Sequence, residues 1–195
     1  MKYNDLKKLF DSQIERLRPY CSSQIIQMLM VGMEKVLNHA ETLTIGEGHL
    51  VFAPVLTPLY LGYQGIVALV RNGSKSGYTY LDPTRIEDVE KVPLKLYYQF
   101  DVEDGTKRLG VKPEVSEKEI QAEKRLRSTT AEIVSIAIHT AVLSKHNMDA
   151  VGSRYGSVNA PFLCLNVGEP RLSWGNLGSA NGHWGAPSCS SRLEL

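Results

Sequence analysis

Cysteine is scarce in this chain, and the number of cysteines is odd. The 195 residues include three cysteines, Cys21, Cys164 and Cys189, which stand far apart. Small secreted proteins held by disulfide bonds have an even number of cysteines at close spacings, so this pattern excludes a disulfide framework. It suits a reducing compartment, and we expect a cytoplasmic protein.

An excess of charge of either sign is also missing. Lys and Arg number 22 and Asp and Glu number 21, which gives a formal net charge of +1 at pH 7. A protein whose main partner is nucleic acid normally carries a strong basic excess, because it neutralises phosphates. The composition therefore argues against nucleic acid as the main partner, although it leaves room for a local basic site.

Long uninterrupted apolar segments are absent as well. Residues 50–70 include no charged residue, but prolines and glycines interrupt them. Such breakers favour short buried strands and turns over a membrane span. The first 20 residues contain three acidic residues where a secretory signal needs an apolar run. We therefore expect no membrane partner.

The standard signatures of nucleotide, hydrolase and zinc sites do not occur. No Walker loop, GxGxxG, GxSxG, HExxH or clustered CxxC is present. His139 and His146 lie seven residues apart near Asp149, a spacing that suits a packed helix better than a zinc site. We therefore predict no cofactor and no metal site. The segment 47–49, Glu-Gly-His, has two interpretations, an acid/base pair or a turn.

Apolar periodicity predicts an N-terminal helical hairpin over residues 1–45. Apolar residues recur every three or four positions over 3–17, Pro19 ends this helix, and Ser22 or Ser23 can cap a second one. A strand-rich part follows over 46–105. Its expected strands are 49–56 and 96–102, with a hairpin of 66–70 and 78–81 around the turn at 72–77.

Helices return over 116–146. Ser116 with Glu119, and Thr129 with Glu132, have the spacing of capping boxes, and the first precedes a charged helix that ends near residue 126. The second opens a helix over about residues 130–145 that is apolar almost all round, so we expect a central buried helix. Strands are expected at 161–167 and 172–174. Because helices and strands occur in runs, the sequence predicts a single α+β domain over 1–195, with a mainly antiparallel sheet packed with the N-terminal hairpin.

The tail, residues 147–192, is rich in glycine, serine, arginine and tryptophan. It includes both tryptophans of the chain but no lysine. Flexible linkers lack tryptophan and apolar strand material, so we expect an ordered tail. Ordered glycine-rich loops serve tight turns or the close approach of a ligand.

The arginines of the tail suggest what such a ligand is. Arginine recognises carboxylates and phosphates through a planar fork of donors. We predict a pocket for a small anionic ligand, in which Arg154 and Arg192 bind the anion, Ser153 adds backbone donors, and Trp174 and Trp184 form walls. The alternative is that the arginines make structural ion pairs with acidic neighbours.

Catalysis and two other functions stay open. His183 and Cys189 are candidates for a base and its thiol nucleophile, so the sequence does not decide whether the protein is an enzyme. One alternative is a non-enzymatic interaction or structural module, either a homodimer or a partner-binding surface. Another is single-stranded nucleic-acid binding through strand tyrosines such as Tyr78 and Tyr80, which the neutral charge balance opposes.

Several short motifs occur in order over about residues 97–192. They are DVEDG at 101–105, a threonine cap at Thr129, GSRYG at 152–156, PRLSW at 170–174, and HWGAPSC at 183–189 followed by Arg192. Together they resemble an uncharacterised bacterial family, a domain of unknown function. The resemblance implies that these positions form one arrangement, and it carries over no activity.

Overall fold

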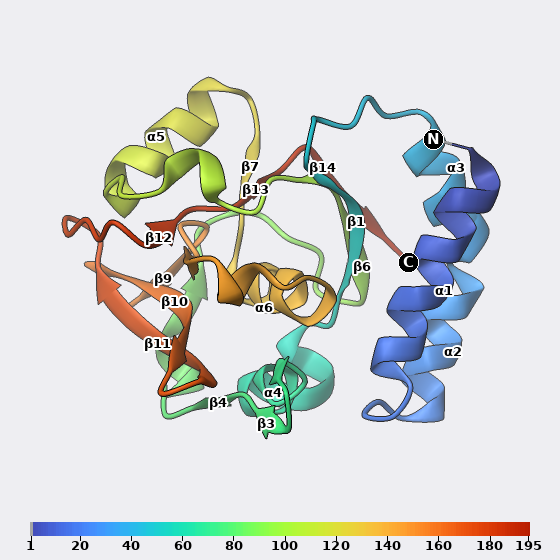
Figure 1. Cartoon of the computed structure of the whole chain (residues 1–195), viewed down its shortest axis with the longest axis horizontal. Coiled ribbons are helices and arrows are strands. Elements are labelled where there is room, and N and C mark those ends of the chain that lie inside the picture. Colours follow the sequence, from blue (N-terminus) through green and yellow to red (C-terminus); the bar gives the residue numbers. More distant parts are fainter. Residues whose placement is uncertain (1) are drawn as a thin grey trace.

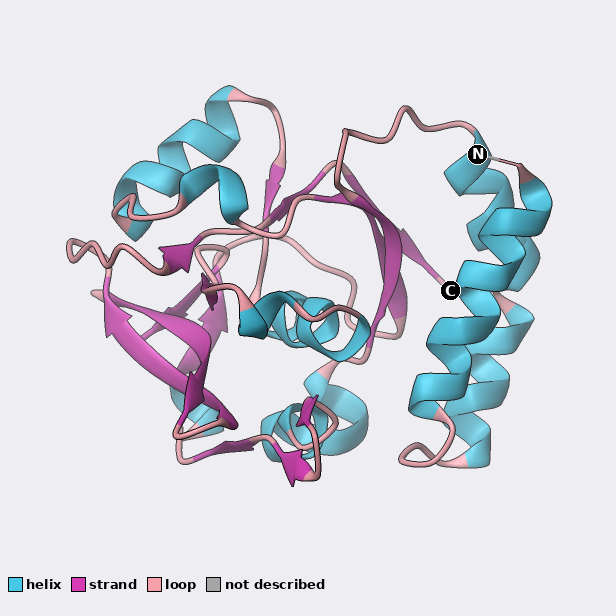
Figure 2. Ribbon diagram, in the orientation of Figure 1, coloured by secondary structure: helices cyan, strands magenta, loops and turns pink. Residues whose placement is uncertain are grey.

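The fold stacks groups of helices and two sheets in alternating layers (Figure 1). In the computed structural model, which describes residues 2–195, three N-terminal helices cover one face of a three-stranded sheet, and helix α6 (Thr130–His139) lies against the other face. A five-stranded sheet packs beyond α6. The prediction of a central buried helix is confirmed, and so is the α+β class with mainly antiparallel strands. Figure 2 shows the same grouping by element type.

The N-terminal layer consists of α1 (Tyr3–Leu17), α2 (Ser23–Val31) and α3 (Met33–Glu41). The hydroxyl of Ser22 accepts the N–H of Ile25 at 3.3 Å, which confirms the expected cap. The predicted two-helix hairpin has three helices in the structure, because the chain interrupts the second one at Gly32. A Cβ added there would lie 2.3 Å from Cδ2 of Leu195, so glycine leaves room for that C-terminal side chain.

The three-stranded sheet has the order β1–β6–β14, with β1 at Leu50–Val55, β6 at Tyr97–Val102 and β14 at Ser191–Glu194. The central strand β6 is buried along its whole length. The ring of Tyr98 stacks on Phe10 of α1 at 5.9 Å, while Gln99 donates to the carbonyl of Glu132 on α6 at 3.2 Å. Helices thus cover both faces of β6, which explains why its sequence shows no alternation of polar and apolar residues.

The predicted hairpin of 66–70 with 78–81 is wrong. The first segment belongs to α4 (Pro58–Val67) and the turn after it, and the short hairpin there joins β2 (Arg71–Asn72) to β3 (Lys75–Ser76). A continuous apolar run lacks periodicity and fits a buried helix as well as a strand, and a proline in the first turn favours the helix. No helix among residues 2–195 is long and apolar enough to cross a membrane.

The five-stranded sheet has the order β12–β8–β10–β11–β4 and is formed mostly by the tail. Its centre is a hairpin of β10 (Asn159–Asn166) and β11 (Glu169–Asn176), which confirms the two strands expected there. Val167 and Gly168 connect them with φ values of 51° and 75°, as a tight hairpin turn requires. The other strands are β4 (Tyr78–Thr79), β8 (Asn147–Asp149) and β12 (Trp184–Gly185).

Two predictions for the helices over 116–146 need correction. Helix α5 spans Pro113–Ala122, so Ser116 lies inside it and caps nothing. Helix α6 does open at Thr129, whose N–H donates to the Glu132 carboxylate at 2.8 Å, but it ends at His139 because Thr140 adopts an extended backbone. The remaining short elements are η1 (Pro83–Arg85), β5 (Ile86–Asp88), η2 (Thr106–Arg108), β7 (Leu126–Arg127), η3 (Val142–Ser144), β9 (Ser153–Tyr155) and β13 (Ser188–Cys189).

Candidate functional site

Arg192, on strand β14, is held by a buried ion pair. Its Nε donates to Oε1 of Glu132 at 2.6 Å and its Nη2 donates to Oε2 at 2.9 Å. The Glu132 side chain is 0% exposed and that of Arg192 is 6% exposed. Arg192 also donates to the carbonyls of Arg127 at 2.9 Å and Lys91 at 3.3 Å. Its guanidinium thus joins three parts of the chain.

Arg154, on strand β9, lies in the same network. It donates to Glu117 of α5 at 2.7 Å, and Glu117 also accepts from the side chain of Arg127. Arg127 in turn donates to Glu90 at 2.8 Å. Strand β7 therefore links the surroundings of Arg154 to those of Arg192. Each guanidinium, however, is bonded to a carboxylate of this chain, which favours the alternative of structural ion pairs.

Ser153 lies beside this network and is also bonded within the chain. Its hydroxyl donates to Oδ1 of Asp88 at 2.5 Å and accepts the N–H of Thr130 at 2.8 Å. Burial raises the pKa of the Asp88 carboxyl, although the bond from Ser153 opposes this. The side chain therefore ties β9 to β5 and to the first turn of α6.

The two tryptophans of the tail pack on different aromatic neighbours. Trp174 is 48% exposed and stacks on Tyr155 with the ring centroids 6.0 Å apart. Trp184 packs on Phe162 with the centroids 3.9 Å apart. Neither lines the cavity beside Arg192 that is described below.

His183 and Cys189 do not form a nucleophile and its base. The thiol of Cys189 is 0% exposed, and burial raises its pKa far above the ordinary value. His183 lies exposed in the loop before β12. No hydrogen bond between the two is present in residues 2–195. A thiol that stays protonated and inaccessible is a core residue, so Cys189 has no role in the proposals below.

A groove of about 720 Å³ lies beside Arg192 and is here called the β14 groove. Lys91 and Lys95 stand exposed at its rim, and neither is paired with a carboxylate in residues 2–195. Leu94 contributes an apolar side chain that is 80% exposed. The lining comprises Glu90, Lys91, Val92, Pro93, Leu94, Lys95, Leu126, Ser190, Ser191, Arg192 and Glu194.

A second cavity of about 480 Å³, the His49 cleft, lies on another part of the molecule. Its lining comprises Glu47, Gly48, His49, Glu103, Asp104, Thr106, Lys107 and Lys145. Directly behind it, Nδ1 of His49 lies 2.6 Å from Oδ1 of Asp101. The sequence placed an acid/base pair or a turn at 47–49, but it gave no sign that the carboxylate partner would come from the end of β6.

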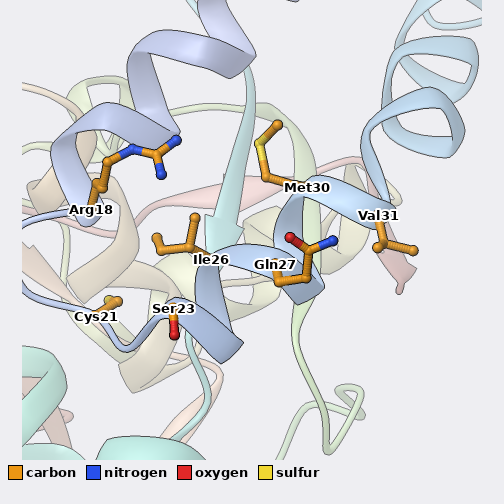
Figure 3. A pocket seen from close by; sticks show the side chains of 7 residues that line it. All are labelled: Arg18, Cys21, Ser23, Ile26, Gln27, Met30 and Val31. Atoms are coloured by element: carbon orange, nitrogen blue, oxygen red, sulfur yellow. The ribbon is translucent and has the colours of Figure 1, made fainter.

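A third cavity, of about 540 Å³, lies on the outer helical layer where α1 meets α2 (Figure 3). Ile26, Met30 and Val31 give it apolar side chains, and Arg18 lies at its edge. Its only thiol is Cys21, whose pKa burial raises. No pair of ionised groups faces this cavity, so its lining suggests no chemistry.

Known proteins offer no guide to choosing among these cavities. In residues 2–195 there is no group of three or more His, Cys, Asp or Glu side chains that would hold a metal ion. Comparisons with protein-family models, with curated proteins and with solved structures find no match to this chain. The resemblance to an uncharacterised bacterial family therefore stays a prediction.

Proposed function

We propose that this chain binds a small amphiphilic anion, one with an apolar body and a carboxylate or phosphate head, in the β14 groove. The observation that carries the proposal is the combination of two unpaired lysines, Lys91 and Lys95, with an apolar wall in one groove of about 720 Å³. Ligand pockets usually measure 300–1,000 Å³ and combine mostly apolar linings with a few polar groups.

The lining divides into parts that suit the two ends of such a ligand. The ammonium groups of Lys91 and Lys95 attract the anionic head. The hydroxyls of Ser190 and Ser191 are bonded within the chain, to the carbonyl of Phe100 at 3.3 Å and to Nε2 of His39 at 3.1 Å. The exposed side chain of Leu94, with its apolar neighbours in the loop, covers the apolar body. Burying each methylene of the ligand there contributes about 0.8 kcal/mol.

Arg192 contributes by positioning the loop, while its own charge is compensated by Glu132. Its Nη1 donates to the carbonyl of Lys91 at 3.3 Å, which fixes the backbone from which that lysine extends. The anionic-ligand prediction is thus kept, with lysines outside the tail taking the role that was first given to arginines within it.

Octanoate, inorganic phosphate and adenosine monophosphate test the proposal in a thermal-shift and calorimetric titration. We expect octanoate to bind and to raise the melting temperature, because it has both an apolar body and a charged head. Phosphate alone should bind at least tenfold more weakly. The double variant Lys91→Ala/Lys95→Ala should lose octanoate binding. Lys118→Ala, an exposed lysine of α5, is the matched control and should leave it unchanged.

Two results would contradict the proposal. One is octanoate binding that the double lysine variant retains in full, which would place the ligand elsewhere. The other is the absence of binding by all three anions at millimolar concentration.

The second candidate function is association with another protein chain through the same groove. It is favoured by the position of β14, which is an edge strand of its sheet, and by the exposure of Leu94. An unpaired strand edge beside an apolar side chain is a common place for self-association or peptide binding. Sedimentation equilibrium decides this point: a dimer that Leu94→Asp dissociates would support association, and a monomer would exclude the homodimer.

A further inference from the structure

The His49 cleft contains a histidine that a carboxylate holds in one orientation. Oδ1 of Asp101 lies 2.6 Å from Nδ1 of His49 and accepts the N–H of Gly46 at 2.8 Å. Oδ2 accepts from Arg125 at 2.6 Å. Asp101 is 5% exposed and adopts a φ of 49°, a left-handed conformation that few residues other than glycine adopt. A buried residue in this conformation is typical of sites where position matters for function.

These contacts fix which nitrogen of His49 carries the proton. Burial alone would raise the pKa of Asp101, but the bonds from Gly46, Arg125 and His49 outweigh it and lower the pKa below the usual value. Asp101 is therefore a carboxylate and can only accept hydrogen bonds. Nδ1 of His49 must donate to it, which leaves a lone pair on Nε2 of the neutral ring. The His49 side chain is 21% exposed and lines the cleft, so this lone pair belongs to an accessible base.

Another part of the cleft lining carries a hydroxyl that is backed by a second histidine. Oγ1 of Thr106 lies 3.2 Å from Nε2 of His146, and Nδ1 of His146 lies 2.9 Å from the carbonyl of Asn147. Burial alone would lower the pKa of His146, but the Asp104 carboxylate and the Asn147 carbonyl outweigh it and raise the pKa. The raised pKa favours the imidazolium form, in which Nε2 of His146 donates to Oγ1 of Thr106, while the Thr106 hydroxyl itself interacts with the Asp104 carboxylate.

We propose that the His49 cleft is a catalytic site that hydrolyses small carboxylic esters bearing a negatively charged group. Nε2 of His49 takes a proton from water while the water oxygen bonds to the ester carbonyl carbon. The hydroxyl of Thr106 turns from the Asp104 carboxylate and donates a hydrogen bond to the oxygen on which negative charge develops. The bond from carbon to the leaving oxygen then breaks, and His49 returns its proton to that oxygen. Ester and water become acid and alcohol, and His49 is neutral again.

The charge of the cleft selects the substrate class. Lys107 is paired with Glu123 at 2.7 Å and Glu103 with buried Arg108 at 3.0 Å, so these charges are compensated. Asp104 faces Nε2 of His146 at 3.8 Å, so Glu47 and Lys145 are the two lining charges without a partner of opposite charge in residues 2–195. We assign the ammonium group of Lys145, the cation of these two, to an anionic group of the substrate.

Two esters that release the same leaving group test the site, with the full chain as the enzyme. One is 4-nitrophenyl hydrogen succinate, which carries a carboxylate, and the other is neutral 4-nitrophenyl acetate. We expect His49→Gln to lower kcat for both by at least about 100-fold, the usual contribution of a general base. Lys145→Ala should raise KM for the succinate alone. His183→Gln, which replaces an exposed histidine outside the cleft, is the matched control and should change neither rate.

The orientation of His49 has a readout that needs no activity. NMR of the ring nitrogens in the wild type should show His49 protonated on Nδ1 and unprotonated on Nε2. Asp101→Asn should change this tautomer, and it should fold because asparagine tolerates the left-handed conformation well. Asp101 is thus a positioning residue. An Nε2-protonated tautomer in the wild type, or ester hydrolysis that is equal in the wild type and in folded His49→Gln, would overturn the proposal.

Discussion

Removal of the Glu132 carboxylate is the sharpest test of how the tail is held. Glu132 is fully buried and accepts hydrogen bonds from the N–H of Thr129 at 2.8 Å and from Nε of Arg192 at 2.6 Å. In Glu132→Ala, the Arg192 guanidinium would stay buried with only backbone carbonyls as partners. The first turn of α6 would lose its cap in the same change.

The expected cost follows from these contacts. Breaking a buried ion pair by removing one partner costs about 3–5 kcal/mol, because a buried charge is left without compensation. Folded proteins have a total stability of about 5–15 kcal/mol, so the variant should fold but be much less stable. The double variant Glu132→Ala/Arg192→Met leaves no lone charge, so it should be about 2 kcal/mol more stable than Glu132→Ala alone.

Urea unfolding followed by tryptophan fluorescence measures these differences. The midpoint should fall in Glu132→Ala and recover part of the way in the double variant, with the slope unchanged. A single-variant cost below about 1 kcal/mol, the value typical of an exposed pair, would refute the reasoning. Strict additivity of the two changes would refute it as well, since it would mean that the side chains do not interact.

Three further predictions concern other buried positions. Gly152→Ala should cost about 1–3 kcal/mol in urea unfolding, because its Cβ would lie 2.6 Å from a backbone oxygen of β7, whereas Gly182→Ala, with open space around it, should cost almost nothing. Burial raises the pKa of Asp149 to about 7, so the folded state keeps a proton that the unfolded chain releases near pH 4. Its contribution to stability is therefore lost as the pH rises from about 4 to about 7, and the wild type should lose about 3 kcal/mol between pH 5 and pH 8 relative to Asp149→Asn. A chromogenic thiol reagent should label Cys189 only in urea but partly exposed Cys21 in the folded protein, and rapid labelling of Cys189 without urea would contradict its burial.

Features that depend on neighbours within a few residues could be predicted from the sequence. The helix at 3–17, the Ser22 cap, the opening of α6 at Thr129 and the strands of the β10–β11 hairpin are of this kind. Each rests on the regular spacing of apolar residues or on a hydrogen bond that spans three or four residues. The failures at 66–70 and at the end of α6 share one cause: where apolar residues follow one another without a clear period, the sequence does not show which face is inside or where the element stops.

The composition and local patterns by themselves determined the α+β class, the absence of a disulfide framework and the presence of an ordered tail rich in arginine. Only the tertiary structure decided what those arginines and histidines meet. Glu132 lies 60 positions from Arg192, Glu117 lies 37 from Arg154, and Asp101 lies 52 from His49. A buried charge needs a compensating group, and the stacking of layers determines which distant part of the chain supplies it.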